Sequence, residues 1–573
     1  MARGYRPVVR DQEFLLAPNM ADWLPDDHLV WFLAEVITEL DTGVLHARAA
    51  RRRDGAAARS AAGRAGYDPD MLLLVLIYAY ACGERSSRRI ERLCSTDVAF
   101  RIACAGDVPD HSVLARFRQH HADAFAGLFT QVLELCRAAG LVNLATVAID
   151  GTRIGANASP GANRTESTLR AEINRHDQNS AGNSAGNSAD READREADRE
   201  VVEQIMGEAD AVDTAEDAEF GAGRRGDELP SGWNSPGAGR RNRIRAALDQ
   251  IQAAQQAERD AQTTRQTQRH ATDLAALEAA EAALASEIAT RQARREAWEQ
   301  AWEQAMTTPG APLPRGRAPL PVEESTKVAA ARARVDKARY RLTHPDTAPR
   351  PGGSQPGSQP GSQPGKRARR GLPRRDPGQE RRANTTDPDS RVMPTRHGWV
   401  QAYNAQIAAT ADQIILGTDL TTNPADLPSY HPMITIVTDA ATALDDQIHT
   451  LLFDAGYASN TTLDHAHTNT PDQPDRLIAL GKAHSVRDNA RDHPTSGPPP
   501  PGSTGRDAMD HRLRTPEGAA LYQRRGATVE PAIGNLKKII DRFSRRGLAA
   551  ARSELDLAAT VFNLLKIYRA RTA

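Results

Sequence analysis

Three acidic residues stand at widely separated points of the chain, where strands or a helix could bring them together. Asp150 closes the apolar run of "VAIDGTRIGANAS" (147–159), and Asp454 closes that of "IHTLLFDAGYAS" (448–459). Glu530 lies in the strongly helical C-terminal stretch that begins "VEPAIGNLKK". Two aspartates at strand ends and a glutamate on a helix can converge on one edge of a mixed sheet.

Carboxylates gathered in this way favour a metal site. They repel one another, and burying them unpaired is costly. Divalent cations relieve both problems, and a donor set of Asp and Glu without His or Cys suits Mg²⁺. Two such ions about 4 Å apart can activate a water or hydroxyl and stabilise the leaving oxygen of a phosphoryl displacement. Each aspartate taken alone could instead be a turn or cap residue.

These segments resemble the three catalytic blocks of DDE-type insertion-sequence transposases, which have an RNase H-like core. The blocks are "VAIDGTRIGANAS", "FDAGYAS" and "LYQRRGATVEPAIGNLKK". Upstream, "HLVWFLAEVI", "GYDPDMLLLVLIYAYACGERSSRRIE" and "PDHSVLARFR" resemble the helical domain that precedes the core in one large group of these enzymes. "TDPDSRVMPTRHGWVQAYNAQ" resembles their second strand and its lead-in. The resemblance covers roughly 1–160 and 385–573.

The resemblance implies a catalytic, metal-binding triad of Asp150, Asp454 and Glu530, with Mg²⁺ or Mn²⁺ and two ions as the cofactor. The family's signature of Tyr, Arg, Glu and Lys maps onto Tyr522, Arg525, Glu530 and Lys537. Four residues separate Arg525 from Glu530, one more than in the commonest form.

The second carboxylate of the triad has an alternative candidate. Asp439 in "ITIVTDA" is the alternative to Asp454, which we prefer because Gly456 and Tyr457 complete its "DAGY" block.

Helix geometry gives expectations for two residues near the third carboxylate. Lys537 is seven residues after Glu530, two helical turns on the same face, where it can meet a DNA phosphate. Thr528 can cap this helix and place Glu530 and Pro531 in the first turn.

Near Asp150, Gly151 and the small residues after it would let a DNA backbone approach closely. Arg153 would lie near the phosphates, or in a structural salt bridge.

Residues 1–140 read as a helical domain. Asp68 and Pro69 predict the start of an apolar helix that stops at Gly83. A second helix begins at a cap of Asp110 or Ser112. A basic helix after a turn can enter a major groove, so the DNA-binding candidates here are Arg116, Arg118, Arg88 and Arg89. An ordinary solvated face of a bundle is the alternative.

The middle of the chain differs from both ends. Overall, 39% of residues are hydrophobic and 5% aromatic, and this deficit lies in residues 160–390, which include "GNSAGNSADREADREADRE" and "GSQPGSQPGSQPG". Residues 240–306 and 326–343 predict long helices that "TTPGAPLPRGRAPLP" breaks into an antiparallel hairpin. The basic segment 366–382 could touch phosphates or be a solvated linker.

We therefore predict an α/β fold: an RNase H-like five-stranded mixed sheet with flanking helices, preceded by an all-α domain and split by a long insertion. The expected divisions are a helical DNA-binding domain (1–140), the first part of the catalytic domain (141–160), a low-complexity and coiled-coil-like insertion (161–390) and the remainder of the catalytic domain (391–573).

The predicted function is DNA transposition. The protein would bind the terminal inverted repeats of its element, cleave a strand at each end and transfer it to target DNA, acting as a homo-oligomer on double-stranded DNA. A nuclease without strand transfer and an inactive DNA-binding scaffold are the alternatives. The net charge of −1 neither favours nor excludes binding of nucleic acid. The longest apolar run is too short for a bilayer, and four cysteines without metal-ligand spacing predict buried thiols in a cytoplasmic, nucleoid-associated protein.

Overall fold

The computed structural model describes residues 19–47, 66–181, 238–308, 312–314, 316–344, 380–395, 398–468 and 473–572. The two quoted repeats and most of the basic segment 366–382 lie outside these residues. The chain divides into two compact units, one of residues 1–250 and 380–573 and the other of residues 251–379. No helix in the described part of the chain is long and apolar enough to cross a membrane.

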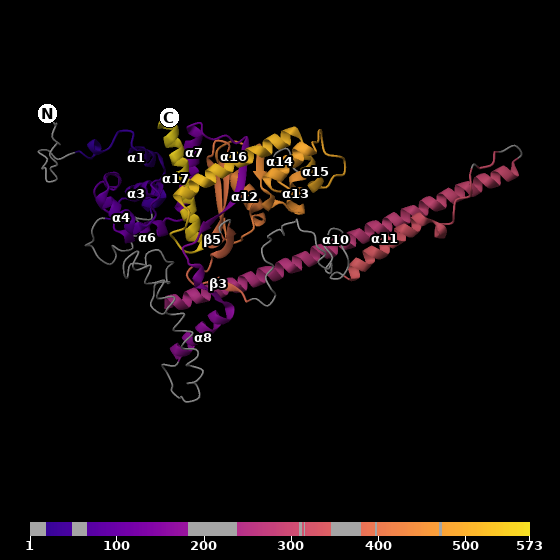
Figure 1. Ribbon diagram of the computed structural model, residues 1–573, viewed down its shortest axis with the longest axis horizontal. Helices are drawn as coiled ribbons and strands as arrows, with labels where there is room; N and C mark the ends of the chain where they lie inside the picture. Colours follow the sequence, from indigo (N-terminus) through magenta and orange to yellow (C-terminus); the bar gives the residue numbers. More distant parts are fainter. Residues whose placement is uncertain are drawn as a thin grey trace, which may run out of the picture. The chain divides into compact units, whose positions relative to one another are not determined.

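A mixed sheet forms the centre of the larger unit (Figure 1). Its six described strands are β1 (Thr146–Gly155), β4 (Arg391–Thr395), β5 (Gly398–Thr410), β6 (Ile415–Thr421), β7 (Thr450–Phe453) and β8 (Asp475–Ile478). β5 pairs antiparallel with β1 along one edge, and with β4 and then β6 along the other. β7 and β8 continue the sheet in parallel beyond β1. The predicted mixed α/β fold and the β5–β6 hairpin are confirmed. The sheet has six described strands where five were predicted, because β5 is long enough to pair with β4 near its start and with β6 near its end.

Helices cover this sheet. They are α12 (Tyr430–Ala443), α13 (Asn460–His467), α14 (Ala483–Asp492), α15 (Gly505–Leu513), α16 (Pro516–Ile539) and α17 (Leu548–Thr572), with single 3-10 turns at Leu427–Ser429 and Ala455–Tyr457. α16 packs on β1, β5 and β7, and α12 and α17 pack on β6. The α17 residue Asn563 is fully buried and hydrogen-bonds both backbone groups of Ile415, with distances of 3.0 and 2.9 Å. This contact ties the last helix to an edge strand.

The N-terminal part is helical, as predicted. It contains a 3-10 turn (Met20–Trp23) and α1 (Leu29–Glu39), α3 (Pro69–Ala81), α4 (Ser87–Thr96), α5 (Val98–Ala103), α6 (His111–His120) and α7 (Ala124–Ala138). Asp68 caps α3 and Asp110 caps α6, as expected, and Gly83 turns the chain after α3 with φ of +76°. α3 and α7 pack on α17. One cysteine differs from the prediction: Cys82 is exposed, because it follows the last turn of α3.

The insertion leaves and rejoins the core through a short two-stranded sheet. β2 (Asn163–Thr165), which follows a 3-10 turn (Pro160–Ala162), pairs antiparallel with β3 (Arg382–Asn384). Glu166 N donates to Arg381 O at 3.0 Å where α8 (Glu166–Ala181) begins. The two ends of the insertion therefore lie side by side.

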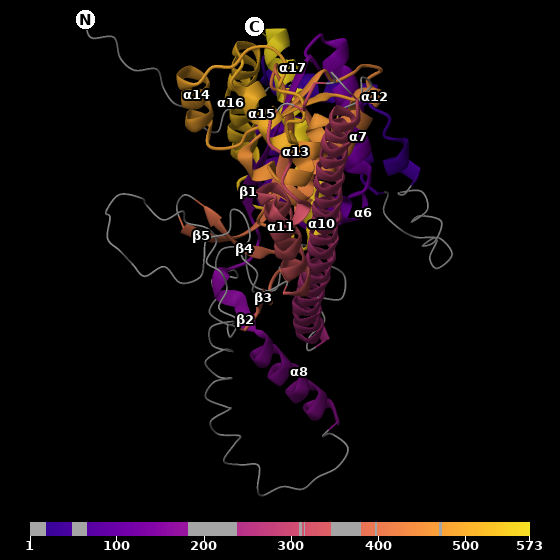
Figure 2. The same cartoon turned by 90° about the vertical axis from the view of Figure 1, so that its right-hand side faces the viewer.

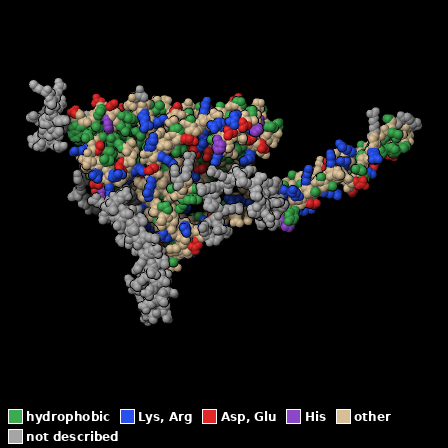
Figure 3. All heavy atoms as spheres, in the orientation of Figure 1, with side chains coloured by type: hydrophobic (Ala, Val, Ile, Leu, Met, Phe, Trp, Pro, Cys, Tyr) green, Lys and Arg blue, Asp and Glu red, His purple; other side chains and the backbone are tan. Residues whose placement is uncertain are grey.

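The smaller unit is a helical hairpin. It contains α10 (Ala238–Thr307) from residue 251 onward, a 3-10 turn (Val322–Glu324) and α11 (Thr326–Thr343). Arg339 on α11 pairs with Glu281 on α10 at 3.1 Å, and Figures 1 and 2 show the two helices side by side. The buried residues of α11 recur every three or four positions: Val328, Ala331, Val335 and Ala338. Acidic and basic side chains intersperse along the hairpin (Figure 3). The predicted hairpin is confirmed, and its coiled-coil packing stays a prediction.

Candidate catalytic site

Asp150 and Asp454 lie at neighbouring positions of two parallel strands. The register pairs Ile149 with Phe453, so the next residue on each strand is one of the two aspartates. The expectation that Asp150 ends its strand is wrong, because β1 continues to Gly155 through its pairing with β5. Asp150 instead marks the point where the parallel partner β7 stops. Beyond that point β1 pairs with β5 on one side, and on the other side it forms an isolated parallel bridge between Gly155 and Arg542.

The electrostatics of the pair are unfavourable without a counter-charge. Burial, and then the nearby carboxylates of Asp454 and Asp426, raise the pKa of Asp150 from 3.8 to about 6 against the opposing effect of Arg525. Burial likewise raises the pKa of Asp454. The sheet edge is therefore a place where negative charge is costly and where a cation would be stabilised.

Arg525 joins α16 to this edge. Its Nη2 lies 2.8 Å from Asp150 Oδ2, and the residue is 7% exposed. Asp150 is the first of the groups that raise the pKa of Arg525 above its usual value, although burial acts in the opposite direction. Tyr522, one helical turn earlier, is 6% exposed, and burial raises its pKa. Two residues of the predicted signature thus lie beside the first aspartate.

Glu530 occupies the middle of α16. The prediction that Thr528 caps this helix is wrong: α16 begins at Pro516 with Thr515 as its cap, and Thr528 Oγ1 donates to Arg524 O at 2.9 Å. The sequence between residues 516 and 528 has no helix breaker other than Gly518 and Gly526, so the helix extends through it and contains Pro531 internally.

A cavity of about 300 Å³ between α14 and α16 brings Glu530 into the same neighbourhood as Tyr522 and Arg525, which line it together with His484 and Arg487. Among the residues that the structure describes, Asp150, Asp454 and Glu530 do not bring their ligand oxygens within 4.8 Å of one another. Glu530 is exposed on the helix surface, where its side chain is not fixed by core packing. Binding of one ion by all three carboxylates would therefore require side-chain movement, for which the exposed Glu530 has the most freedom.

Two cations face the site from different elements. Arg153 on β1 lies 3.6 Å from Asp426 Oδ1 through Nη1, so the salt bridge foreseen as an alternative is present. Lys537 on α16 is half-buried, and its pKa is lowered by burial and then by Arg153. The effect of Arg153 on Lys537 shows that the two side chains lie on the same side of the site.

The sequence analysis missed Asp426, Asn404 and Gln406. Asn404 and Gln406 are fully buried polar residues of β5 that donate to Asp426 Oδ1, and Gln406 lies opposite Gly151 in the register. The available signal was their spacing: two amides two residues apart occupy one face of a strand that is otherwise apolar. The space beside Gly151 is filled by Asp426, so the expectation that it admits a DNA backbone is wrong.

The rival aspartate lies elsewhere. Asp439 is exposed on helix α12, away from any strand end.

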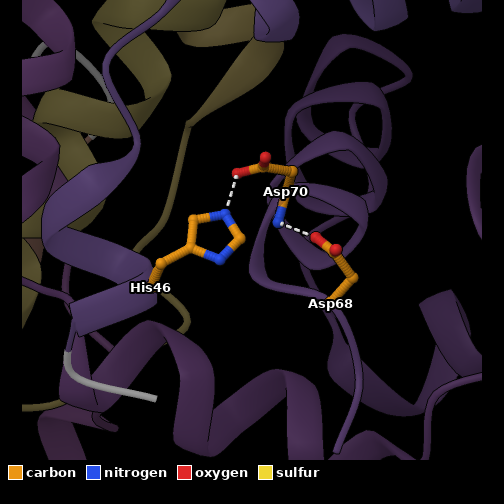
Figure 4. Close-up of side chains that lie close together, drawn as sticks. All are labelled: His46, Asp68 and Asp70. Atoms are coloured by element: carbon orange, nitrogen blue, oxygen red, sulfur yellow. Dashed lines mark hydrogen bonds and ion pairs between the residues drawn. The ribbon is translucent and has the colours of Figure 1, made fainter. Parts of the chain in front are cut away.

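Two other groups of three His, Asp or Glu side chains in the described residues lie close enough to share an ion. In the group of Figure 4, His46 Nε2 is 3.1 Å from Asp70 Oδ1, while Asp68 accepts from the backbone of Asp70. In the other, Glu91 accepts from the backbone and ring of His111. Both groups fix helix starts, those of α3 and α6.

Comparisons with known families agree with this arrangement at both ends of the chain. Residues 18–120 match the family described as "Transposase domain (DUF772)", and residues 502–568 match "Transposase DDE domain". At both ends the chain is therefore similar to transposases, and at its C-terminal end to those with a DDE domain. No curated protein and no solved structure matches it. The C-terminal match includes all four signature residues, whereas Asp150 and Asp454 lie outside both matched ranges.

The structure places the four N-terminal arginines in different surroundings. Arg118 is 2% exposed and donates to Arg85 O at 2.9 Å and to Ser87 Oγ, so in this structure it is enclosed and cannot reach DNA. Arg116 and Arg89 are exposed, and Arg88 is half-buried. Only the latter three remain candidates for a DNA contact.

Proposed function

We propose that this protein is a transposase that binds the terminal inverted repeats of its element and carries out strand cleavage and strand transfer at Asp150, Asp454 and Glu530. The observation that carries the proposal is the ion pair between Arg525 and Asp150. It links the signature helix α16 to the sheet edge at which the two aspartates lie side by side.

The donor chemistry of this edge fits divalent cations. The carboxylates are all oxygen donors. Burial, and then the neighbouring carboxylates, raise the pKa of Asp150, and a bound cation would oppose this shift. Asp150, Asp454 and, after a side-chain movement, Glu530 would hold Mg²⁺ or Mn²⁺, with two ions as the expected number. When bound, such ions lower the pKa of an attacking water and stabilise charge on the leaving oxygen.

The chain's own residues supply the rest. Arg525 holds Asp150 in one direction through its ion pair, and Arg153 and Lys537 would bind the phosphate that flanks the scissile bond. In cleavage, a water oxygen bonds to phosphorus as the 3′ oxygen leaves and takes up a proton. In transfer, that 3′-OH attacks a phosphodiester of target DNA and a target oxygen leaves. Both steps are displacements at the same kind of centre.

Binding of double-stranded DNA is assigned to the exposed residues Arg116 and Arg89, to the half-buried Arg88, and to Tyr522 and Lys537 beside the triad. The division into a DNA-binding domain (1–140), a split catalytic domain and an insertion (161–390) belongs to the same proposal. The hairpin of α10 and α11 would serve self-association on DNA, and the protein would act in the cytoplasm, associated with the nucleoid.

Conservative substitutions of the triad test the proposal. Asp150→Asn, Asp454→Asn and Glu530→Gln should each abolish Mg²⁺-dependent nicking of a terminal-repeat duplex while leaving binding of that duplex in Ca²⁺ intact, because each removes one ligand charge at constant bulk. Asp439→Asn is the matched control and should nick normally.

Two outcomes would contradict the proposal. Full nicking in EDTA would refute the metal chemistry, and loss of nicking in Asp439→Asn but not in Asp454→Asn would refute the assignment of the second carboxylate. Pre-cut ends incubated with target DNA separate a transposase from a nuclease, since only the former joins them.

A further inference from the structure

Asp426 occupies a space left by two glycines that follow the two aspartates. It lies in the loop after β6, just before the 3-10 turn at Leu427–Ser429. A Cβ added to Gly151 would overlap Asp426 Oδ1, and one added to Gly456 would come within 3.0 Å of Asp426 Oδ2. Gly151 follows Asp150 directly, and Gly456 is two residues after Asp454. The carboxylate of Asp426 therefore lies next to both glycines, close to Asp150 on β1 and to Asp454 at the end of β7.

Hydrogen bonds fix this carboxylate in one orientation. Asn404 Nδ2 and Gln406 Nε2 donate to Asp426 Oδ1 at 2.8 and 3.0 Å. Gln406 Oε1 in turn accepts from Tyr457 Oη, within the "DAGY" block of Asp454. The network thus connects β5, the loop after β6 and the loop after β7.

The same network holds Arg153. Its Nη1 lies 3.6 Å from Asp426 Oδ1 and donates to Asn404 Oδ1, and its Nη2 donates to Pro424 O. Three acceptors on one side of the guanidinium remove most of the freedom of a long side chain, which would otherwise sample many rotamers. After burial, Arg153 is the second cause that lowers the pKa of Lys537, so the two cations lie near each other.

We propose that Asp426 is a positioning residue of the catalytic site, which fixes Arg153 beside the catalytic aspartates through the space that Gly151 and Gly456 leave open. This inference rests on the proposed function. Placing a third aspartate next to Asp150 and Asp454 adds repulsion, and a purely structural role would be filled as well by a neutral side chain. The negative charge is required because Arg153 is its partner.

A double-mutant cycle tests the coupling. Nicking rates at saturating DNA and Mg²⁺ are measured for Asp426→Asn, Arg153→Gln and the double variant, together with duplex affinity in Ca²⁺ and the urea midpoint of unfolding. Asp426→Asn keeps the shape of the side chain and should lower the rate by about 10-fold or more, as misplaced positioning groups do. The double variant should be no slower than the slower single one, because both remove one interaction.

Gly151→Ala provides a second route to the same defect, since its Cβ would push Asp426 aside. It should resemble Asp426→Asn in rate. Gly127→Ala, at a position with nothing within 4 Å of an added Cβ, is the matched control and should nick like the natural chain.

Four outcomes would overturn the inference. If the fold-losses in nicking rate of the two single variants multiply in the double variant, Asp426 does not act through Arg153. An unchanged rate in Asp426→Asn, with only its unfolding midpoint lowered, would show a packing role. Loss of one Mn²⁺ from the DNA-free protein, counted by electron paramagnetic resonance, would make Asp426 a metal ligand instead. Failure of the natural chain to nick would refute the proposed function as well, and is thereby distinguishable from the other three.

Discussion

Replacing Asp150 by asparagine is expected to stabilise the metal-free protein although it abolishes catalysis. The buried carboxylate has its pKa raised from 3.8 to about 6, so its ionisation at neutral pH costs free energy. The difference corresponds to about 3 kcal/mol. The side chain is 21% exposed, and Asn loses the charge that pairs with Arg525, so we expect a gain of about 1 to 2 kcal/mol.

The pH dependence gives the sign of this effect. The pKa of Asp150 is higher in the folded than in the unfolded protein, so folding favours its protonated form. The contribution of this carboxyl group to stability is therefore fully present below about pH 3.8 and is lost as the pH rises to about 6. The gain in Asp150→Asn should therefore be absent near pH 3.5 and complete at pH 7. Saturating Mg²⁺ should reverse the order, because only the natural carboxylate pair binds it well.

Urea unfolding in EDTA at the two pH values, followed by circular dichroism, measures the free energy of unfolding. Asp454→Asn provides a parallel case, since burial also raises the pKa of that carboxyl. A lower stability of Asp150→Asn at pH 7 in EDTA would refute the reasoning. It would mean that the free energy lost by leaving the buried guanidinium of Arg525 without its partner exceeds the free energy gained by removing the buried charge of Asp150.

Three further predictions concern other parts of the molecule. Asn563→Ala should lower the free energy of unfolding in urea by about 2 to 4 kcal/mol, because it leaves two buried backbone groups of β6 without partners, and a loss below about 0.5 kcal/mol would contradict this. Arg116→Gln with Arg89→Gln should reduce the slope of log affinity for DNA against log salt by about 0.9 per lost phosphate contact, whereas Arg118→Gln should reduce stability and leave the slope unchanged. Replacing residues 251–379 by a short Gly/Ser linker should leave a core that unfolds cooperatively in urea, and a core that no longer folds would refute the separation of the two units.

Local signals predicted much of the fold. The start of α3 follows from Asp68 and Pro69 alone, since a capping carboxylate and a proline at the first position act within one turn. The β5–β6 hairpin follows from two β-prone runs separated by a few polar residues. The alignment of Asp150 with Asp454 was accessible because each closes an apolar run that becomes a strand of the same sheet.

Features that depend on distant segments were not accessible. The position of Asp426 depends on Gly151 in β1 and on Gly456 in the turn after β7, so the sequence around residue 426 does not predict it. Arg118 looks like a surface cation in its helix, yet Ser87 and Arg85 O enclose it. The predicted cap at Thr528 is wrong for another reason. Thr515 followed by Pro516 is an equally good signal for a helix start, and the helix that begins there contains Pro531 internally.

The short pairing of β2 with β3 holds the two ends of the insertion side by side. The length of the chain between residues 251 and 379 therefore matters little to the larger unit, because doubling the length of a loop costs only about 0.6 kcal/mol. The insertion also contains tandem units of four residues, such as the repeated "GSQP". Slippage during DNA replication adds or removes such units in whole codons, so the reading frame is kept and the catalytic sheet is undisturbed. A change in the number of these units should therefore leave the pairing of β1 with β7, which aligns Asp150 with Asp454, unaltered.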